Sequence, residues 1–533
     1  MEITKRNYKK KLKELSLSEY PSLDTYLRNV KIKIEKKEVL SVSEELMTFP
    51  KLKKYFEDIS LEENRLYVQT LNFDSFSHRP PRDFQKEGIK FLLLRDRSIL
   101  ADDMGLGKSI QSILASLLLP EDYKILFITM RTLKYNIEEE IKPYSDSYKV
   151  IEKSWEGGYK FTIVHYEALK KFKTDILKEN YNCVIIDEAH KIKNSSTSRS
   201  KNVSEIVKNT KKVWLLTGTP MSNRPSDYYN LLKLIKHPIS NNWVTYITKY
   251  CDGKQIFGHW DIKGATNLDD LFLKTKDSVL RRLKKEVLTD LPNKERQAVY
   301  LHLENKKGYD KVIENYKEKK MAELTELEKS FFDEDGMDVA NMTKFILWRQ
   351  YCALQKIEDG SLIDLIENQI EEGNKVVVFT NFTKVIDVVS AKFPENSVFI
   401  DGRIKDAHER LRIVKSFNED PNLKLLICNL QVGSVGLNIQ GANVGIINDM
   451  DWVPSTMAQA EDRLWRMGQL RNVSILYPVY KGTVEEIVYK VINSKMRNIS
   501  TAIEGKEEDY FGDNEKEKRN EKMSILEEIF AQM

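Results

Sequence analysis

A glycine-rich loop is the first stretch of this 533-residue sequence whose residues could perform chemistry, and it reads Gly105-Leu106-Gly107-Lys108-Ser109. Glycines let backbone N–H groups close around phosphate oxygens, because no Cβ stands in the way. Lys108 is placed to reach the β- and γ-phosphates of a nucleotide, and the Ser109 hydroxyl is placed to ligate Mg²⁺. The loop therefore predicts a phosphate-binding site.

The segments on either side give the loop the context that a phosphate-binding loop requires. A short apolar strand is predicted over 98–101 and a helix over 110–119, whose N-terminal partial charge favours phosphate. Asp102 departs from the strict pattern, since it stands where the first glycine is expected. Taken alone, the loop has an alternative interpretation as a chance Gly-Lys-Ser turn.

A pair of carboxylates downstream argues against that alternative. The apolar segment 183–186 predicts a strand, and it runs into Asp187-Glu188-Ala189-His190. A carboxylate at a strand tip can hold a phosphate-bound Mg²⁺, which assigns Asp187 to the metal. Glu188 is placed to orient and deprotonate an attacking water. Two solvated acids are the alternative interpretation of this pair.

Three further stretches could serve the same chemistry. Gln85 lies upstream of the loop, and its amide could satisfy the donor and acceptor edge of adenine. The turn Thr217-Gly218-Thr219 could sense the γ-phosphate through its hydroxyls, and a plain turn is the alternative. Arg463 and Arg466 lie one helical turn apart. They could stabilise transition-state charge, an effect worth about 10³–10⁵ in rate, whereas a salt-bridged helix is the alternative.

Strand-like and helix-like segments alternate in two blocks, which predicts an α/β fold with two parallel-sheet lobes. In the first block strands are predicted over 98–101, 125–129, 161–165, 184–187 and 213–216, and helices over 110–119, 133–141 and 168–177. In the second block strands are predicted over 375–379, 398–400, 425–428, 444–448 and 473–477. Because only the first block has a phosphate loop, we expect the nucleotide to bind between the lobes.

The composition predicts five regions: an N-terminal accessory region 1–74, a nucleotide-binding lobe 75–220, helical protrusions and a linker 221–360, a second lobe 361–493, and a C-terminal brace or tail 494–533. The first is either a nucleic-acid-binding module or a solvated packing extension. The basic stretch Leu280–Val287 is either a nucleic-acid contact or a solvated helix face. The last is either a brace or partner helix or a frayed tail.

Charge and cysteine usage exclude several classes of protein. The net charge of +4 is too small for an overall polycation, so any basic surface must be local. The four cysteines are far apart in sequence, which argues against a zinc site and a disulfide framework and fits a reducing compartment. No apolar run is long enough for a membrane span and no secretory signal is recognisable, so we expect no membrane partner and a cytoplasmic location.

Taken together, these motifs closely resemble those of Swi/Snf-type ATPases of helicase superfamily two, over roughly residues 82–493. Those that carry the resemblance are Phe84–Gly88, Asp103–Ser109, Asp187–Asn194, Leu216–Pro220 and Gln459–Arg463. Asp103–Lys108 and His190–Asn194 are the family-specific parts. The pair Asn267-Leu268, the segment Leu280–Leu288 and the pair Leu291-Pro292 resemble the annealing-helicase and fork-remodelling branch.

The resemblance implies two RecA-like lobes that hydrolyse ATP with Mg²⁺ when stimulated by duplex DNA. It implies that the catalytic residues are Lys108, Asp187, Glu188, Arg463 and Arg466, and that Ser109 and Asp187 bind the metal. The implied nucleotide contacts are Arg82, Gln85, Met104, Gly105, Leu106, Gly107, Lys108, Ser109, Gly436, Arg463 and Arg466. The implied DNA contacts, mostly to phosphate, are Arg131, Thr132, Tyr166, Lys193, Thr380, Asn381 and Gly433.

By this resemblance we expect a monomeric, ATP-dependent double-stranded DNA translocase that remodels DNA branches or DNA-bound proteins, as in DNA repair. A strand-separating helicase and an RNA- or polymerase-directed ATPase are alternatives. A nucleotide-gated scaffold without turnover is another, and the intact carboxylates and arginines argue against it. Ser109 stands where the family commonly has threonine, and Trp465 where histidine is common. The lysine-rich chain without recognisable zinc or chromatin-reading segments favours a bacterial or phage origin.

Overall fold

The structure is a computed structural model, and it describes residues 68–74, 76–256, 258–314, 339–433, 437–507 and 510–511. The chain divides into two compact units, residues 1–80 and residues 81–533. Most of the predicted accessory region and the final part of the predicted tail lie outside the described residues. The five predicted region boundaries stay predictions, and both sheets described below belong to the second unit.

The first lobe is built on a seven-stranded sheet in which every strand pair is parallel. Three central strands consist of consecutively buried residues, which is typical of parallel sheets covered on both faces. In spatial order the strands are β3 (Tyr148–Val150), β4 (Phe161–His165), β2 (Ile125–Thr129), β5 (Cys183–Ile186), β6 (Lys212–Leu216), β1 (Arg97–Leu100) and β9 (Val279–Leu280).

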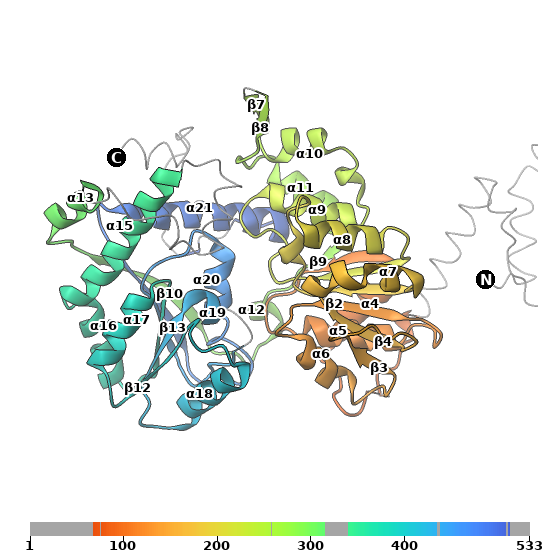
Figure 1. Cartoon of the computed structure of the whole chain (residues 1–533), viewed down its shortest axis with the longest axis horizontal. Helices are drawn as coiled ribbons and strands as arrows, with labels where there is room; N and C mark the ends of the chain where they lie inside the picture. Colours follow the sequence, from red (N-terminus) through yellow and green to blue (C-terminus); the bar gives the residue numbers. More distant parts are fainter. Residues whose placement is uncertain are drawn as a thin grey trace, which may run out of the picture. The chain divides into compact units, whose positions relative to one another are not determined.

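Helices alternate with the strands of this lobe, and each of them carries buried apolar residues (Figure 1). They are α4 (Asp83–Leu93), α5 (Lys108–Leu117), α6 (Lys134–Ile141), α7 (Leu169–Lys178), α8 (Ser198–Val207) and α9 (Pro225–Leu234), with short 3-10 turns η3 (Tyr166–Ala168), η4 (Ala189–Ile192) and η5 (Pro238–Ser240). Further along the chain come α10 (Trp243–Tyr250), the hairpin β7 (Lys254–Ile256) and β8 (His259–Asp261), α11 (Leu268–Thr275) and α12 (Lys284–Val287).

The second lobe has a six-stranded sheet, again parallel throughout. In spatial order its strands are β10 (Lys294–Leu301), β15 (Val473–Tyr480), β14 (Val444–Ile447), β11 (Val376–Thr380), β13 (Leu425–Asn429) and β12 (Ser397–Ile400). Its helices are α13 (Lys306–Glu314), α15 (Val339–Glu358), α16 (Ser361–Glu371), α17 (Thr383–Lys392), α18 (Ala407–Glu419), α19 (Leu430–Gly433), α20 (Pro454–Glu461) and α21 (Val484–Glu504). The predicted α/β fold with two parallel-sheet lobes is confirmed.

The region predicted to be helical protrusions also supplies an edge strand to each sheet. Strand β9 pairs with β1, the strand that leads into the glycine-rich loop. Strand β10 pairs with β15 along eight residues of the second sheet. Residues 281–293 therefore form a short direct connection between the sheets, with α12 inside it.

Helix α21 belongs to both lobes. Val488 and Ile492 lie in the apolar core of the second lobe, whereas Ala502 and Ile503 lie in the core of the first. The helix runs without a break through the predicted boundary at residue 493. Within the described part of that last region, residues 494–504 therefore continue this helix (Figure 1).

All four cysteines are free and buried. Among the described helices, none combines the length and the apolar character that a bilayer crossing demands.

Candidate active site

The glycine-rich loop connects β1 to α5. Gly105 and Gly107 have φ angles of 79° and 74°, a left-handed conformation that side chains disfavour. Helix α5 begins at Lys108, two residues earlier than predicted, and Gly107 is its N-cap. The Lys108 ammonium donates to the carbonyl oxygens of Asp102 at 2.9 Å and Asp103 at 3.2 Å. The loop thus keeps a positive charge beside backbone N–H groups at a helix N-terminus, which suits an anionic phosphate.

Gln85 on α4 contacts this loop directly. Its side-chain Nε2 donates to the Leu106 carbonyl at 3.1 Å, and its Oε1 accepts from the Arg82 backbone N–H at 3.0 Å. A Cβ at Gly107 would lie 2.7 Å from the Gln85 Nε2, and the φ of 74° there also favours glycine. The Gln85 stretch and the glycine-rich loop are therefore in direct contact. The Gln85 amide donor, which was predicted to bind adenine, donates to the Leu106 carbonyl in the structure.

Asp102, the residue that breaks the strict loop pattern, is a fully buried anchor. Arg282 donates to its carboxylate with two nitrogens, at 2.9 and 2.5 Å, and Gln111 donates at 3.0 Å. Arg282 also donates to the Phe84 carbonyl. The Asp102 carboxylate therefore accepts hydrogen bonds from a side chain of α5 and from a side chain of the inter-lobe connection, residues 281–293.

We expect the substitution Asp102→Gly to destabilise the protein, although it restores the strict glycine pattern. Removing the carboxylate leaves the buried Arg282 guanidinium without its partner, and such losses are worth about 3–5 kcal/mol. The free energy of unfolding in urea measures the effect. Asp122→Gly removes an exposed acid from a turn and should leave the unfolding midpoint unchanged. Equal midpoints for the two variants would contradict the anchoring role.

Asp187 and Glu188 follow β5 at the carboxyl edge of the first sheet, next to the end of β2. Thr129 donates its hydroxyl to the Asp187 carboxylate at 2.9 Å, and Tyr166 donates to the Asp187 carbonyl at 2.6 Å. Burial raises the pKa of Asp187 above its usual range, and the neighbouring Glu188 carboxylate adds to the rise. A cation bound there would offset both effects, and carboxylate and hydroxyl oxygens are the ligands that Mg²⁺ prefers. Asp187 and Ser109 therefore fit the predicted metal by their chemistry.

Glu188 has a φ of 49°, a left-handed conformation that is uncommon outside glycine and is often found at functional sites. One of its carboxylate oxygens lies 3.3 Å from His190 Nδ1, which in turn lies 3.3 Å from the Thr217 hydroxyl. Burial is the main cause that lowers the pKa of His190, so its ring favours the neutral form. A polar chain thus joins the candidate base to the Thr217 turn.

The Thr217 turn also touches the glycine-rich loop. A Cβ at Gly218 would lie 2.7 Å from Met104 Cγ and 3.5 Å from Lys108 Nζ. The Thr219 backbone N–H donates to the Thr217 hydroxyl at 3.1 Å, which holds the turn in shape. The structure therefore brings together the three stretches of the first lobe that the sequence singled out for phosphate chemistry.

Arg463 and Arg466 follow α20 in the second lobe, and both are half-buried. Burial lowers the pKa of Arg463, and the charge of Arg466 lowers it further. The Glu188 carboxylate acts in the opposite direction, which places Arg463 within electrostatic reach of the first lobe. Arg463 thus lies close enough to Glu188 for the two charges to interact.

The predicted DNA contacts divide into exposed and internal residues. Arg131 and Thr132 are exposed just after β2, and Lys193 is half-buried and donates to Asp227 at 3.3 Å. Tyr166 and Thr380 are buried and donate their hydroxyls to Asp187 and Asp449. For these two residues the DNA contact stays a prediction, and in the structure both hydroxyls have partners within the protein.

The remaining predicted contacts lie in the second lobe and at the edge of α4. Asn381 donates to the Asp449 carboxylate at 2.7 Å and is half-buried. Gly433 ends α19, Gly436 lies outside the described residues, and Arg82 is exposed at the start of α4.

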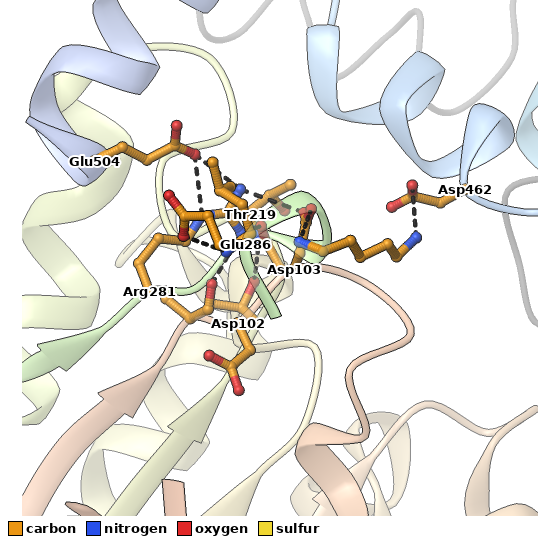
Figure 2. A network of polar contacts seen from close by, with 12 residues as sticks. Asp102, Asp103, Thr219, Arg281, Glu286, Asp462 and Glu504 are labelled. Carbon is orange, nitrogen blue, oxygen red and sulfur yellow. Dashed lines mark hydrogen bonds and ion pairs between the residues drawn. The ribbon is translucent and has the colours of Figure 1, made fainter. Parts of the chain in front are cut away.

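The basic stretch Leu280–Val287 contains both buried and exposed basic residues, so neither interpretation offered for it holds along its whole length. Arg282 is 8% exposed and Lys284 only 1%, so these residues are neither a surface contact nor part of a solvated helix face. Arg281 donates to the carbonyls of Ala101 and Gly218 and to Glu504 at the end of α21 (Figure 2). No local sequence pattern signals this burial, because the acidic partners lie far away in the chain.

Two family models match the chain consecutively: the SNF2-related domain over residues 129–355 and the helicase conserved C-terminal domain over residues 359–468. Cattle "DNA annealing helicase and endonuclease ZRANB3" is 29% identical over 453 residues, covering 80% of this chain and 41% of that protein. Xenopus tropicalis "SWI/SNF-related matrix-associated actin-dependent regulator of chromatin subfamily A-like protein 1" is 29% identical over 432 residues, covering 79% and 44%.

The chain thus spans about two fifths of the length of these curated relatives. Among solved structures, a Sulfolobus solfataricus SWI2/SNF2 ATPase core in complex with double-stranded DNA is 25% identical, covers 77% of this chain and 90% of that one, and has a TM-score of 0.38. The two family models together match more than half of the chain, and their order follows that of the two lobes. The chain therefore contains an SNF2-related domain followed by a helicase conserved C-terminal domain.

Proposed function

We propose that this protein is an ATP-dependent double-stranded DNA translocase that remodels DNA branches or DNA-bound proteins. One observation carries the proposal: a single residue, Lys284, contacts both Asp103 in the phosphate loop and Asp462 beside Arg463. The arginine segment of one lobe is therefore held next to the phosphate loop of the other. The names of the relatives, which are annealing-helicase and chromatin-regulator names, support DNA as the substrate.

Each group at this junction has a distinct task in the proposed reaction. Lys108 and the backbone N–H groups of the loop bind the phosphates of ATP, while Ser109 and Asp187 would hold Mg²⁺. The metal would neutralise charge on the phosphates when bound. The Glu188 carboxylate accepts a proton from the attacking water, and its contact with His190 orients it. Arg463 and Arg466 stabilise the charge that develops in the transition state.

Alternating closure and opening of the lobes would couple this hydrolysis to movement along DNA. Arg131, Thr132 and Lys193 on the first lobe and Asn381 on the second are the proposed contacts for the DNA backbone. We include in the proposal that the protein acts as a monomer in the cytoplasm of a bacterial or phage-infected cell. Strand separation is the second candidate function, and a displacement assay on forked versus fully paired DNA distinguishes the two.

We expect the ATPase rate to rise strongly with duplex or branched DNA and much less with single-stranded DNA or RNA. The measurement compares phosphate release with duplex, fork, four-way junction, single-stranded DNA and RNA at equal nucleotide concentration. DNA affinity should fall steeply between about 50 and 200 mM salt, because phosphate contacts release counterions. Equal stimulation by RNA would favour the RNA-directed alternative. A rate that stays at background with every nucleic acid would contradict the proposal and favour a scaffold.

A further inference from the structure

The inter-lobe connection begins with two arginines that are both tied to the first lobe. Arg281 lies 3.4 Å from the Asp103 carboxylate and 3.0 Å from that of Glu504. Figure 2 shows Arg281 among Asp102, Asp103 and Glu504. Arg282 binds the buried Asp102 carboxylate, as described above. This end of the connection is therefore fixed to the two acids that precede the glycines of the phosphate loop.

Lys284 reaches from this anchored end to the second lobe. Its backbone N–H donates to the Asp103 carboxylate at 3.3 Å. Its ammonium donates to the Asp462 carboxylate at 2.8 Å and to the Trp465 carbonyl at 2.8 Å. A Cβ at Gly105 would lie 3.4 Å from Lys284 Cε, so the aliphatic stem of the lysine passes beside the phosphate loop.

The two acceptors of the ammonium are the immediate neighbours of the arginines. Asp462 precedes Arg463 and Trp465 precedes Arg466, so one cation holds the Asp462 side chain and the Trp465 backbone, each next to an arginine. The Trp465 ring lies 5.2 Å from the ammonium and its Nε1 donates to the Pro292 carbonyl at 2.7 Å. The arginine segment is therefore held by the inter-lobe connection at both of its ends.

Apolar packing also joins the phosphate loop, the inter-lobe connection and the segment that follows Arg466. Phe84, Leu106 and Leu288 form a small core against which Met467 packs. This apolar cluster can hold the two lobes together. The buried Lys284 ammonium, with its two acceptors, is therefore better suited to orient the arginine segment than to add stability. Burial lowers the pKa of Lys284, and the carboxylates of Asp462 and Asp103 oppose that shift.

We infer that Lys284 is a positioning residue, which sets Arg463 and Arg466 against the phosphate loop and transmits changes in the loop to them. This inference rests on the proposed function, in which the two arginines complete the ATP site. Lys284 itself touches neither the phosphates nor the metal ligands in this scheme. Its loss should therefore slow hydrolysis more than it weakens nucleotide binding.

The test compares Lys284→Met with the matched control Lys285→Met, which removes an exposed lysine from the same helix. We expect Lys284→Met to lower kcat for duplex-stimulated hydrolysis at least tenfold, while the Kd of a fluorescent ATP analogue changes less than threefold. Lys285→Met should leave both quantities unchanged. A purely structural role would instead alter Kd and kcat together, and that result would overturn the inference.

A second readout follows lobe closure directly. Because all four native cysteines are buried, the exposed positions in Leu177→Cys and Leu411→Cys can be labelled for energy transfer between the lobes. The nucleotide-dependent change in transfer should be present in otherwise wild-type protein and reduced by Lys284→Met. An unchanged kcat together with an unchanged transfer response would overturn the inference.

Asp462→Asn supplies an independent variant that preserves side-chain size. It should reproduce the loss of kcat, and combining it with Lys284→Met should add little, because both act on one contact. If Lys284→Met does not fold, Asp462→Asn decides by the same criteria. Failure of the proposed function is separate: wild-type protein would then show no duplex-stimulated hydrolysis, whereas failure of this inference leaves wild-type stimulation intact.

Discussion

The variant Lys108→Ala is expected to lose ATP hydrolysis by about 10³-fold while keeping its fold, since removing one charge-stabilising donor commonly has effects of about 10²–10³ or more. Lys108 stands at the first position of α5, and its ammonium contacts only loop carbonyls among the hydrogen bonds described for it. Those bonds are local, so little stability depends on them. Phosphate release with saturating duplex DNA measures the loss, and thermal unfolding measures the fold.

The matched control is Lys170→Ala, which removes an exposed lysine of α7 and should leave both measurements unchanged. If Lys108→Ala turned over ATP at the wild-type rate, the phosphate loop would be assigned wrongly. A variant that failed to unfold cooperatively would instead show that the loop contacts of Lys108 matter for folding.

The variant Arg463→Ala is expected to reduce the hydrolysis rate by about 10³–10⁵-fold, the range typical of an arginine that stabilises phosphoryl transfer. Arg463 lies on the second lobe within electrostatic reach of Glu188, and its neighbour Asp462 is held by Lys284. Arg463→Lys should recover little, because a lysine lacks the planar fork of donors. Single-turnover hydrolysis measures the rate apart from product release.

Arg412→Ala on α18 removes an exposed arginine of the same lobe and serves as the control. It should hydrolyse ATP at the wild-type rate. An Arg463→Ala rate within threefold of wild type would show that the second lobe does not complete the site, whatever the effect of Lys108→Ala.

The sheets were predictable because most of their strands are short apolar runs. Val376–Thr380 and Ile125–Thr129 are buried at every position, so their sequences carry the signal of a covered parallel strand. Strand β9 has two residues and β10 alternates between exposed and partly buried positions at the sheet edge. Neither carries an apolar run, and both were therefore missed.

Some residues of the candidate site belong to local sequence patterns, whereas others depend on partners far away in the sequence. The glycine-rich loop and Asp187-Glu188 are local patterns, and the structure places them together with the Thr217 turn. The roles of Asp102 and Lys284 depend on partners 180 and 178 residues away along the chain. The local sequence does not reveal whether a basic side chain pairs with a distant buried carboxylate or is exposed to solvent. Only the folded chain distinguishes these cases.

Helix α21 limits how the two lobes can move. Its 21 residues form a rod of about 32 Å whose first half is embedded in one core and whose last turn is embedded in the other. Such a rod acts as a tether of fixed length, since drawing the lobes apart would pull Ile503 out of its apolar surroundings. Any closure and opening of the lobes in the proposed reaction would therefore have to keep both ends of this helix embedded.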